Sequence, residues 1–117
     1  MALRTSDFDR LYRRAERRER SRRFLVLASP FGSTQGKPSG KGATRWGLSV
    51  KARLGGAVVR NRIKRRLREI LRGAGLAPGW DIVVQPLTAA VATAEFAELN
   101  DELRGLLARA LRKDSRT

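Results

Sequence analysis

The stretch AVVRNRIKRRLREILRGAG, residues 57–75, decides the fold because it joins an apolar stripe to a dense run of basic side chains. Its apolar residues recur at spacings of four, four, three and one, which predicts one amphipathic helix packed on a core. Gly73 and Gly75 suit the end of that helix. The stripe consists of Val59, Ile63, Leu67, Ile70 and Leu71.

The polar side of this helix is almost entirely basic. From Arg60 to Arg72 there are seven basic residues and one acid, Glu69. Successive residues are rotated by about 100° around the helix axis, so several of the polar residues form a broad flank on one side of the apolar stripe. Arg62 and Arg66 lie on the other side of the stripe. Solvated helices usually pair acids with bases four residues apart, and this one mostly does not. The pattern therefore predicts an external polyanion held by planar guanidinium groups. The flank consists of Asn61, Lys64, Arg65, Arg68 and Arg72.

Three short segments have the composition or alternation of strands. They are FLVLA at 24–28, RWGLSVK at 45–51 and WDIVVQ at 80–85. Helical periodicity returns near the N-terminus, from Leu3 to Ala15, and again from Thr93 onward. The last helix is amphipathic and is expected to contribute to the core. Asp81, which follows Trp80 in the third of these strands, is expected to be structural.

Four further segments complete the chain. Glu16 to Arg23 has charges but no apolar stripe and is interpreted as a solvated helix end or connector. Residues 52–59, ARLGGAVV, suit either an extra short strand or the first turn of the central helix. Residues 30–44 concentrate Gly, Pro and Ser and predict a flexible loop, and 113–117 predict a disordered tail.

The order helix, strand, loop, strand, helix, strand, helix predicts an α+β fold. It contains too few strands for a barrel, so we expect a two-layer α/β sandwich in which helices cover one side of a small sheet. The length of 117 residues suits a single domain spanning 1–117.

Charge and composition restrict the classes of function that the chain can have. The formal charge is +15, and residues 1–72 hold 21 of the 26 basic side chains, so we expect one face to bind nucleic acid. No apolar run approaches the length of a membrane span, and a cytoplasmic protein is expected. Cysteine and histidine are absent, which excludes the common nucleophilic triads and histidine- or thiolate-bound zinc. No carboxylate pair suggests a metal site, so no catalytic or metal-binding residues are expected.

The segment from Gly55 to Glu69, GGAVVRNRIKRRLRE, closely resembles the signature of the bacterial ribonuclease P protein, known as the RNR motif. The strand before it, WGLSVKAR, and the opening LRTSDFDRLYRRAERRERSRRFLVL are similar to the family as well, so the resemblance covers about residues 3–87. The signature positions are Arg60, Asn61, Arg62, Lys64, Arg65, Arg68 and Glu69.

The resemblance implies an endoribonuclease subunit that works within a ribonucleoprotein. The protein would be a monomer that binds the catalytic RNA in a 1:1 complex, and it would hold the 5′ leader of precursor tRNA in a cleft between the first helix and the sheet. Mg²⁺ held by the RNA would activate the attacking water, and the crossover through the RNR helix would be left-handed, against the general preference. The implied RNA-binding residues are Arg53, Arg60, Asn61, Arg62, Lys64, Arg65 and Arg68. The implied leader-binding residues are Phe8, Tyr12, Leu27, Ser49 and Lys51.

Some roles stay open at this point. Phe8 and Tyr12 suit the core by their spacing, whereas the resemblance favours stacking on leader bases. Leu27 stands where relatives often have an aromatic residue, which predicts an apolar contact there. Either Lys51 or Arg53 is expected to reach phosphate. The alternative functions are a general or ribosomal RNA-binding protein and a nuclease that acts without RNA.

Overall fold

The computed structural model describes residues 5–30, 44–76 and 79–111. Most of the predicted loop at 30–44 and the whole predicted tail at 113–117 lie outside these residues. The elements in chain order are α1 (Thr5–Arg14), β1 (Arg17–Arg20), β2 (Phe24–Pro30), β3 (Arg45–Leu48), the 3₁₀ turn η1 (Ala52–Leu54), α2 (Ala57–Gly73), β4 (Trp80–Pro86), the 3₁₀ turn η2 (Ala89–Ala92) and α3 (Phe96–Ala110).

The four strands form one sheet in the order β1-β2-β4-β3. β1 and β2 form an antiparallel hairpin, and β2 also pairs antiparallel with β4, with Val26 opposite Val84. β3 pairs parallel with β4. Because parallel neighbours need a long connection, α2 forms the crossover between them. This crossover holds the basic helix against the sheet.

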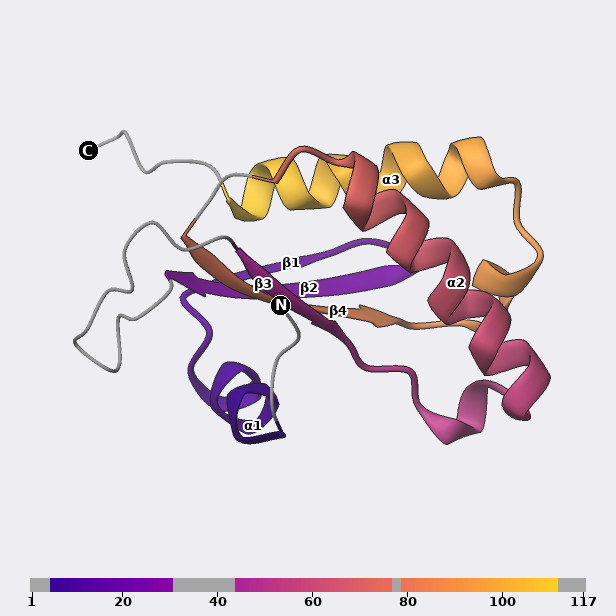
Figure 1. The fold of residues 1–117 in the computed structure, drawn as a ribbon, viewed down its shortest axis with the longest axis horizontal. Helices are drawn as coiled ribbons and strands as arrows, with labels where there is room; N and C mark the ends of the chain where they lie inside the picture. The colour runs from indigo at the N-terminus through magenta and orange to yellow at the C-terminus, as the bar shows by residue number, and fades with distance from the viewer. Residues whose placement is uncertain (1–4, 31–43, 77–78, 112–117) are drawn as a thin grey trace.

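Helices cover both faces of the sheet (Figure 1). α2 and α3 pack on one face, where Val26, Ile82 and Val84 belong to the larger core with Ile63 and Leu67. α1 packs on the opposite face in a smaller cluster of buried residues. The α+β class is confirmed, but the expectation that helices cover only one side is wrong for α1. The central strands are apolar on both faces, so each face must be covered. The smaller cluster consists of Leu11, Leu27 and Val83.

The expected connector at Glu16–Arg23 is wrong, because Arg17–Arg20 forms strand β1. All four residues of β1 are charged, so the strand cannot be recognised from an alternation of apolar and polar residues. The open choice at 52–59 is resolved without a strand, since Ala52–Leu54 forms η1 and α2 begins at Ala57. The second predicted strand is shorter than expected and ends at Leu48.

Candidate RNA-binding surface

The apolar stripe of α2 holds the helix in one orientation. Ile63, Leu67, Ile70 and Leu71 are buried in the larger core, so the remaining positions project away from the sheet. Six of these outward-facing polar residues form one group, in which Lys64 is half-buried and the other five are exposed. Among the residues that the structure describes, none of them forms an ion pair within the chain. The group, called here the RNR surface, consists of Asn61, Arg62, Lys64, Arg65, Arg68 and Arg72.

The turn before α2 depends on Gly55. Its φ of 149° lies in a region that side chains rarely adopt, and a Cβ there would approach the Cβ of Val59 to 2.9 Å. The Nε of Arg60 donates a hydrogen bond to the Gly55 carbonyl oxygen at 3.0 Å. Arg60 is thus half-buried against the turn. The first arginine of the RNR triplet stabilises the start of α2, and the next two residues face outward.

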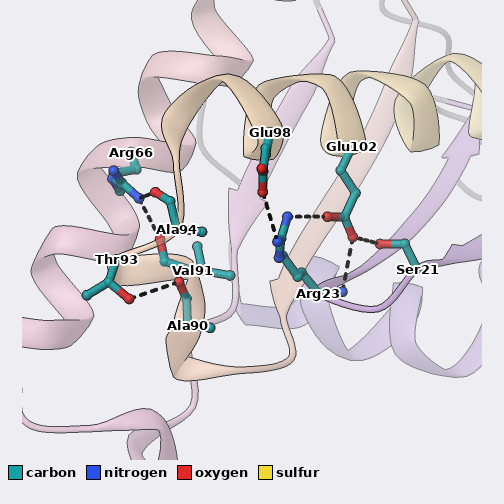
Figure 2. Close-up of polar contacts among 9 residues, drawn as sticks. All are labelled: Ser21, Arg23, Arg66, Ala90, Val91, Thr93, Ala94, Glu98 and Glu102. Carbon is teal, nitrogen blue, oxygen red and sulfur yellow. Dashed lines mark hydrogen bonds and ion pairs between the residues drawn. The ribbon is translucent and has the colours of Figure 1, made fainter.

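Arg66 has internal partners, although it lies between the basic residues of the RNR surface (Figure 2). Its Nη1 donates to the carbonyl oxygens of Val91 at 2.9 Å and Ala94 at 2.7 Å. Val91 belongs to η2 and Ala94 follows it, so Arg66 joins α2 to the segment that leads into α3. Sequence reasoning placed Arg66 beside Arg62 on an exposed side, and the structure corrects this.

Asp81 neutralises arginines on the other face of the sheet. This carboxylate is 1% exposed and accepts hydrogen bonds from Arg10 and Arg45, each at 2.8 Å. Arg10 comes from α1 and Arg45 from β3, so Asp81 in β4 ties three elements together. The expectation that Asp81 is structural is confirmed.

Glu102 performs a similar role on α3 (Figure 2). It accepts hydrogen bonds from the Ser21 hydroxyl, from the Arg23 amide at 3.1 Å and from Arg23 Nη1 at 2.9 Å. Burial raises the pKa of Glu102, but these hydrogen bonds and the Arg23 charge outweigh it and lower the pKa overall. The contacts fix the β1–β2 turn to α3. Asp81 is also paired with arginines, so the two carboxylates neutralise arginines away from the RNR surface.

A second polar site lies on the α1 face of the sheet. The Tyr12 hydroxyl donates to Gln85 Oε1 at 2.7 Å, and the Lys51 ammonium lies 5.5 Å from the centre of the Tyr12 ring. The Ser49 amide donates to the Val84 carbonyl at 3.0 Å, which places Ser49 beside Gln85. The structure thus brings together three of the predicted leader-binding residues. We call Tyr12, Ser49, Lys51 and Gln85 the cleft cluster.

Three other predicted residues have different positions. Leu27 is 0% exposed beneath Leu11, so the prediction that it contacts the leader is wrong. It serves the core because α1 covers its strand. Phe8 belongs to α1, but its side chain lies outside the described part of the protein. Arg53 is exposed on η1, between Lys51 and the start of α2. Gln85 was missed because a lone glutamine in a strand carries no sequence signal.

The described residues contain no group of three or more acidic, histidine or cysteine side chains placed to hold a metal ion. Within the same ranges, no helix has both the length and the apolar character needed to cross a membrane. The fold and charge arrangement define a small basic α+β domain with an open surface complementary to a polyanion.

Comparisons with known proteins identify the family. Residues 3–111 match the family model described as Ribonuclease P. The chain is 40% identical over 112 residues to the ribonuclease P protein component of Streptomyces avermitilis, covering 92% of this chain and 89% of the relative. It is 45% identical over 75 residues to that of Roseiflexus castenholzii, and this alignment spans 62% of each chain. The chain belongs to the ribonuclease P protein family.

Solved structures agree with this assignment. The ribonuclease P protein from Thermotoga maritima matches with a TM-score of 0.76 and 29% identity, over 93% of this chain and 96% of that one. A ribonuclease P protein from Staphylococcus aureus matches with a TM-score of 0.74 at 24% identity, over 95% and 97% of the two chains. The latter supports the fold alone.

Proposed function

We propose that this chain is the protein subunit of ribonuclease P and assists endonucleolytic removal of the 5′ leader from precursor tRNA. The observation that carries the proposal is the RNR surface, where exposed arginines project from a helix fixed by four buried side chains and have no acidic partner among the residues that the structure describes. An exposed guanidinium group can donate two parallel hydrogen bonds to a phosphate. Each such contact also releases counterions from the RNA. The RNR surface therefore binds the catalytic RNA, with Arg53 at its margin.

The cleft cluster suits the single-stranded leader. Tyr12 is half-buried, held by Gln85, and Lys51 is exposed beside it. An aromatic ring fixed in this way offers a stacking platform for an unpaired base, and a neighbouring cation attracts the backbone. Phe8, on the same helix, belongs to this proposal by its position in α1. The two surfaces let one protein bind the catalytic RNA and the precursor tRNA at once.

The division of labour follows from the chemistry available. The chain has neither histidine nor cysteine, and the buried carboxylate of Asp81 and the half-buried carboxylate of Glu102 are both paired with arginines. We assign the hydrolysis to the RNA, with Mg²⁺ held by RNA activating the water that attacks the phosphodiester bond. The protein's cations reduce repulsion between RNA and substrate phosphates, and so lessen the demand for Mg²⁺. We expect one protein per RNA.

Reconstitution tests this proposal. The purified protein is added to a bacterial ribonuclease P RNA, and precursor-tRNA cleavage is measured across a Mg²⁺ series. We expect the protein to restore cleavage at low Mg²⁺, with a product that has the mature 5′ end. Binding to RNA without stimulation at any Mg²⁺ concentration would favour a general or ribosomal RNA-binding protein. Cleavage by the protein with no RNA present would indicate a protein-only nuclease.

A further inference from the structure

Strand β1 presents different chemistry on its two faces. Arg17 and Glu19 point toward α3, where Arg17 Nη1 donates to the Ala110 carbonyl at 3.4 Å and Glu19 accepts from Arg109 at 3.4 Å. Arg18 and Arg20 lie on the α1 face and are exposed. Within the described ranges, neither has an ion pair, and Arg18 makes one exposed hydrogen bond, at 3.3 Å, to the Tyr12 carbonyl. The α1 face of this edge strand is thus left with two available cations.

The pairing of the strands connects these cations to the cleft cluster. Arg20 lies opposite Leu25, and Leu25 lies opposite Gln85. Ser49 follows beside Gln85 after the end of β3. One continuous row on the α1 face therefore crosses the sheet from Ser49 to Arg20. Leu25 in the middle of this row is half-buried, so it offers an apolar surface between the two polar ends.

We propose that Arg18 and Arg20 extend the leader-binding surface, so that the single-stranded leader crosses the strands from the cleft cluster to the β1 edge. This inference rests on the proposed function. Neighbouring strands lie about 4.8 Å apart, so the row spans about 14 Å across four strands. Roughly four nucleotides stacked at 3.4 Å cover that length. At one end of this path lie the cation of Lys51 and the ring of Tyr12. The apolar side chain of Leu25 lies in the middle, and the two guanidinium groups lie at the other end.

Charged residues on an edge strand also prevent sheets from joining at their edges. That role is met by charge of either sign and on either face of the strand. It does not require both unneutralised cations to lie on the face that carries Tyr12 and Lys51, with the acid Glu19 on the opposite face. The two roles differ in what they predict for substrates with and without a leader.

The test uses the holoenzyme reconstituted with a ribonuclease P RNA. Its Kd is measured for leaderless tRNA and for precursors with leaders of about two and about eight nucleotides. The protein variants are Arg18→Ala/Arg20→Ala, Lys51→Ala and the matched control Arg104→Ala. Arg104 is exposed on α3, on the other side of the sheet, and its substitution removes the same charge as each edge substitution.

For the eight-nucleotide leader, we expect the double variant to raise Kd by roughly 3- to 30-fold, as two exposed ion pairs allow. The slope of log Kd against log salt should fall by about 1.4, or about 0.7 for each lost contact with a single strand. Leaderless tRNA should show less than a twofold change. Arg104→Ala should match the wild type on all three substrates, and Arg18→Lys/Arg20→Lys should recover most of the loss.

Two results would overturn the extended path. One is a double variant that behaves like Arg104→Ala on the long leader, and the other is an equal loss on leaderless tRNA. If Lys51→Ala still loses its preference for leader-bearing substrate, the proposed function stands and only the extension fails. If the wild-type holoenzyme itself binds leaderless and leader-bearing tRNA equally, the leader-binding part of the proposed function fails together with the extension.

Discussion

Replacing Asp81 with asparagine should destabilise the protein strongly, although the change is nearly isosteric. The Asp81 carboxylate is 1% exposed and accepts three hydrogen bonds of 2.8 Å from two arginines that are each 21% exposed. Hydrogen bonds to a charged group contribute about 1.5–3 kcal/mol each. Breaking a buried ion pair by removing one partner costs about 3–5 kcal/mol. Because the amide keeps one acceptor oxygen, we expect Asp81→Asn to lose about 2–4 kcal/mol of unfolding free energy.

Urea unfolding measures this loss through tryptophan fluorescence, since Trp80 is adjacent to the substituted residue and the other tryptophan, Trp46, lies on β3. At about 4 °C per kcal/mol for a domain of this size, the melting temperature should fall by about 8–16 °C. The matched control is Asp101→Asn, because Asp101 is exposed on α3 and its substitution should change the free energy by less than about 0.5 kcal/mol. Equal stabilities of the two variants would refute the reasoning that Asp81 holds α1 and β3 on β4.

Three further substitutions test other contacts. Glu102→Gln should destabilise the protein near neutral pH. Since the Glu102 pKa is lowered in the folded state, its contribution is present above the ordinary value of 4.5 and is lost as the pH falls through the lowered value, so unfolding curves of variant and wild type should converge in acid. Arg66→Met should cost about 1–3 kcal/mol in urea unfolding, because the Val91 and Ala94 carbonyls lose a donor, yet leave the salt slope of RNA binding unchanged. Leu67→Ala should cost about 2–5 kcal/mol in the same assay, since Leu67 is fully buried.

The sequence predicts α2 well because its apolar residues follow the helical period without interruption. The same period defines which residues are buried, so the exposed flank with Arg65 and Arg68 follows as well. The strand β1 could not be predicted in this way. All four residues of its RRER sequence are charged, so no apolar alternation marks a strand. The two faces differ only because Arg17 and Glu19 have partners on α3, and those partners lie about 90 residues away along the chain.

The candidate sites show the same limit. A helical wheel places Arg66 on an exposed side, but its partners are the backbone carbonyls of Val91 in η2 and Ala94 just after it, which carry no side-chain signature. Leu27 matched a family position, yet α1 covers it because both faces of β2 are apolar. Gln85 gains its meaning only from Tyr12, 73 residues away. Contacts between distant segments decide which arginines stay available for RNA.

The most direct test is the salt dependence of binding to a ribonuclease P RNA, compared for the wild type and Arg65→Ala/Arg68→Ala. Both arginines are exposed on α2, and each phosphate contact contributes about one unit to the slope of log Kd against log salt. We predict that the slope falls by about two units in the double variant and stays constant in Arg104→Ala. An unchanged slope in the double variant would contradict a role of the RNR surface in binding RNA phosphates.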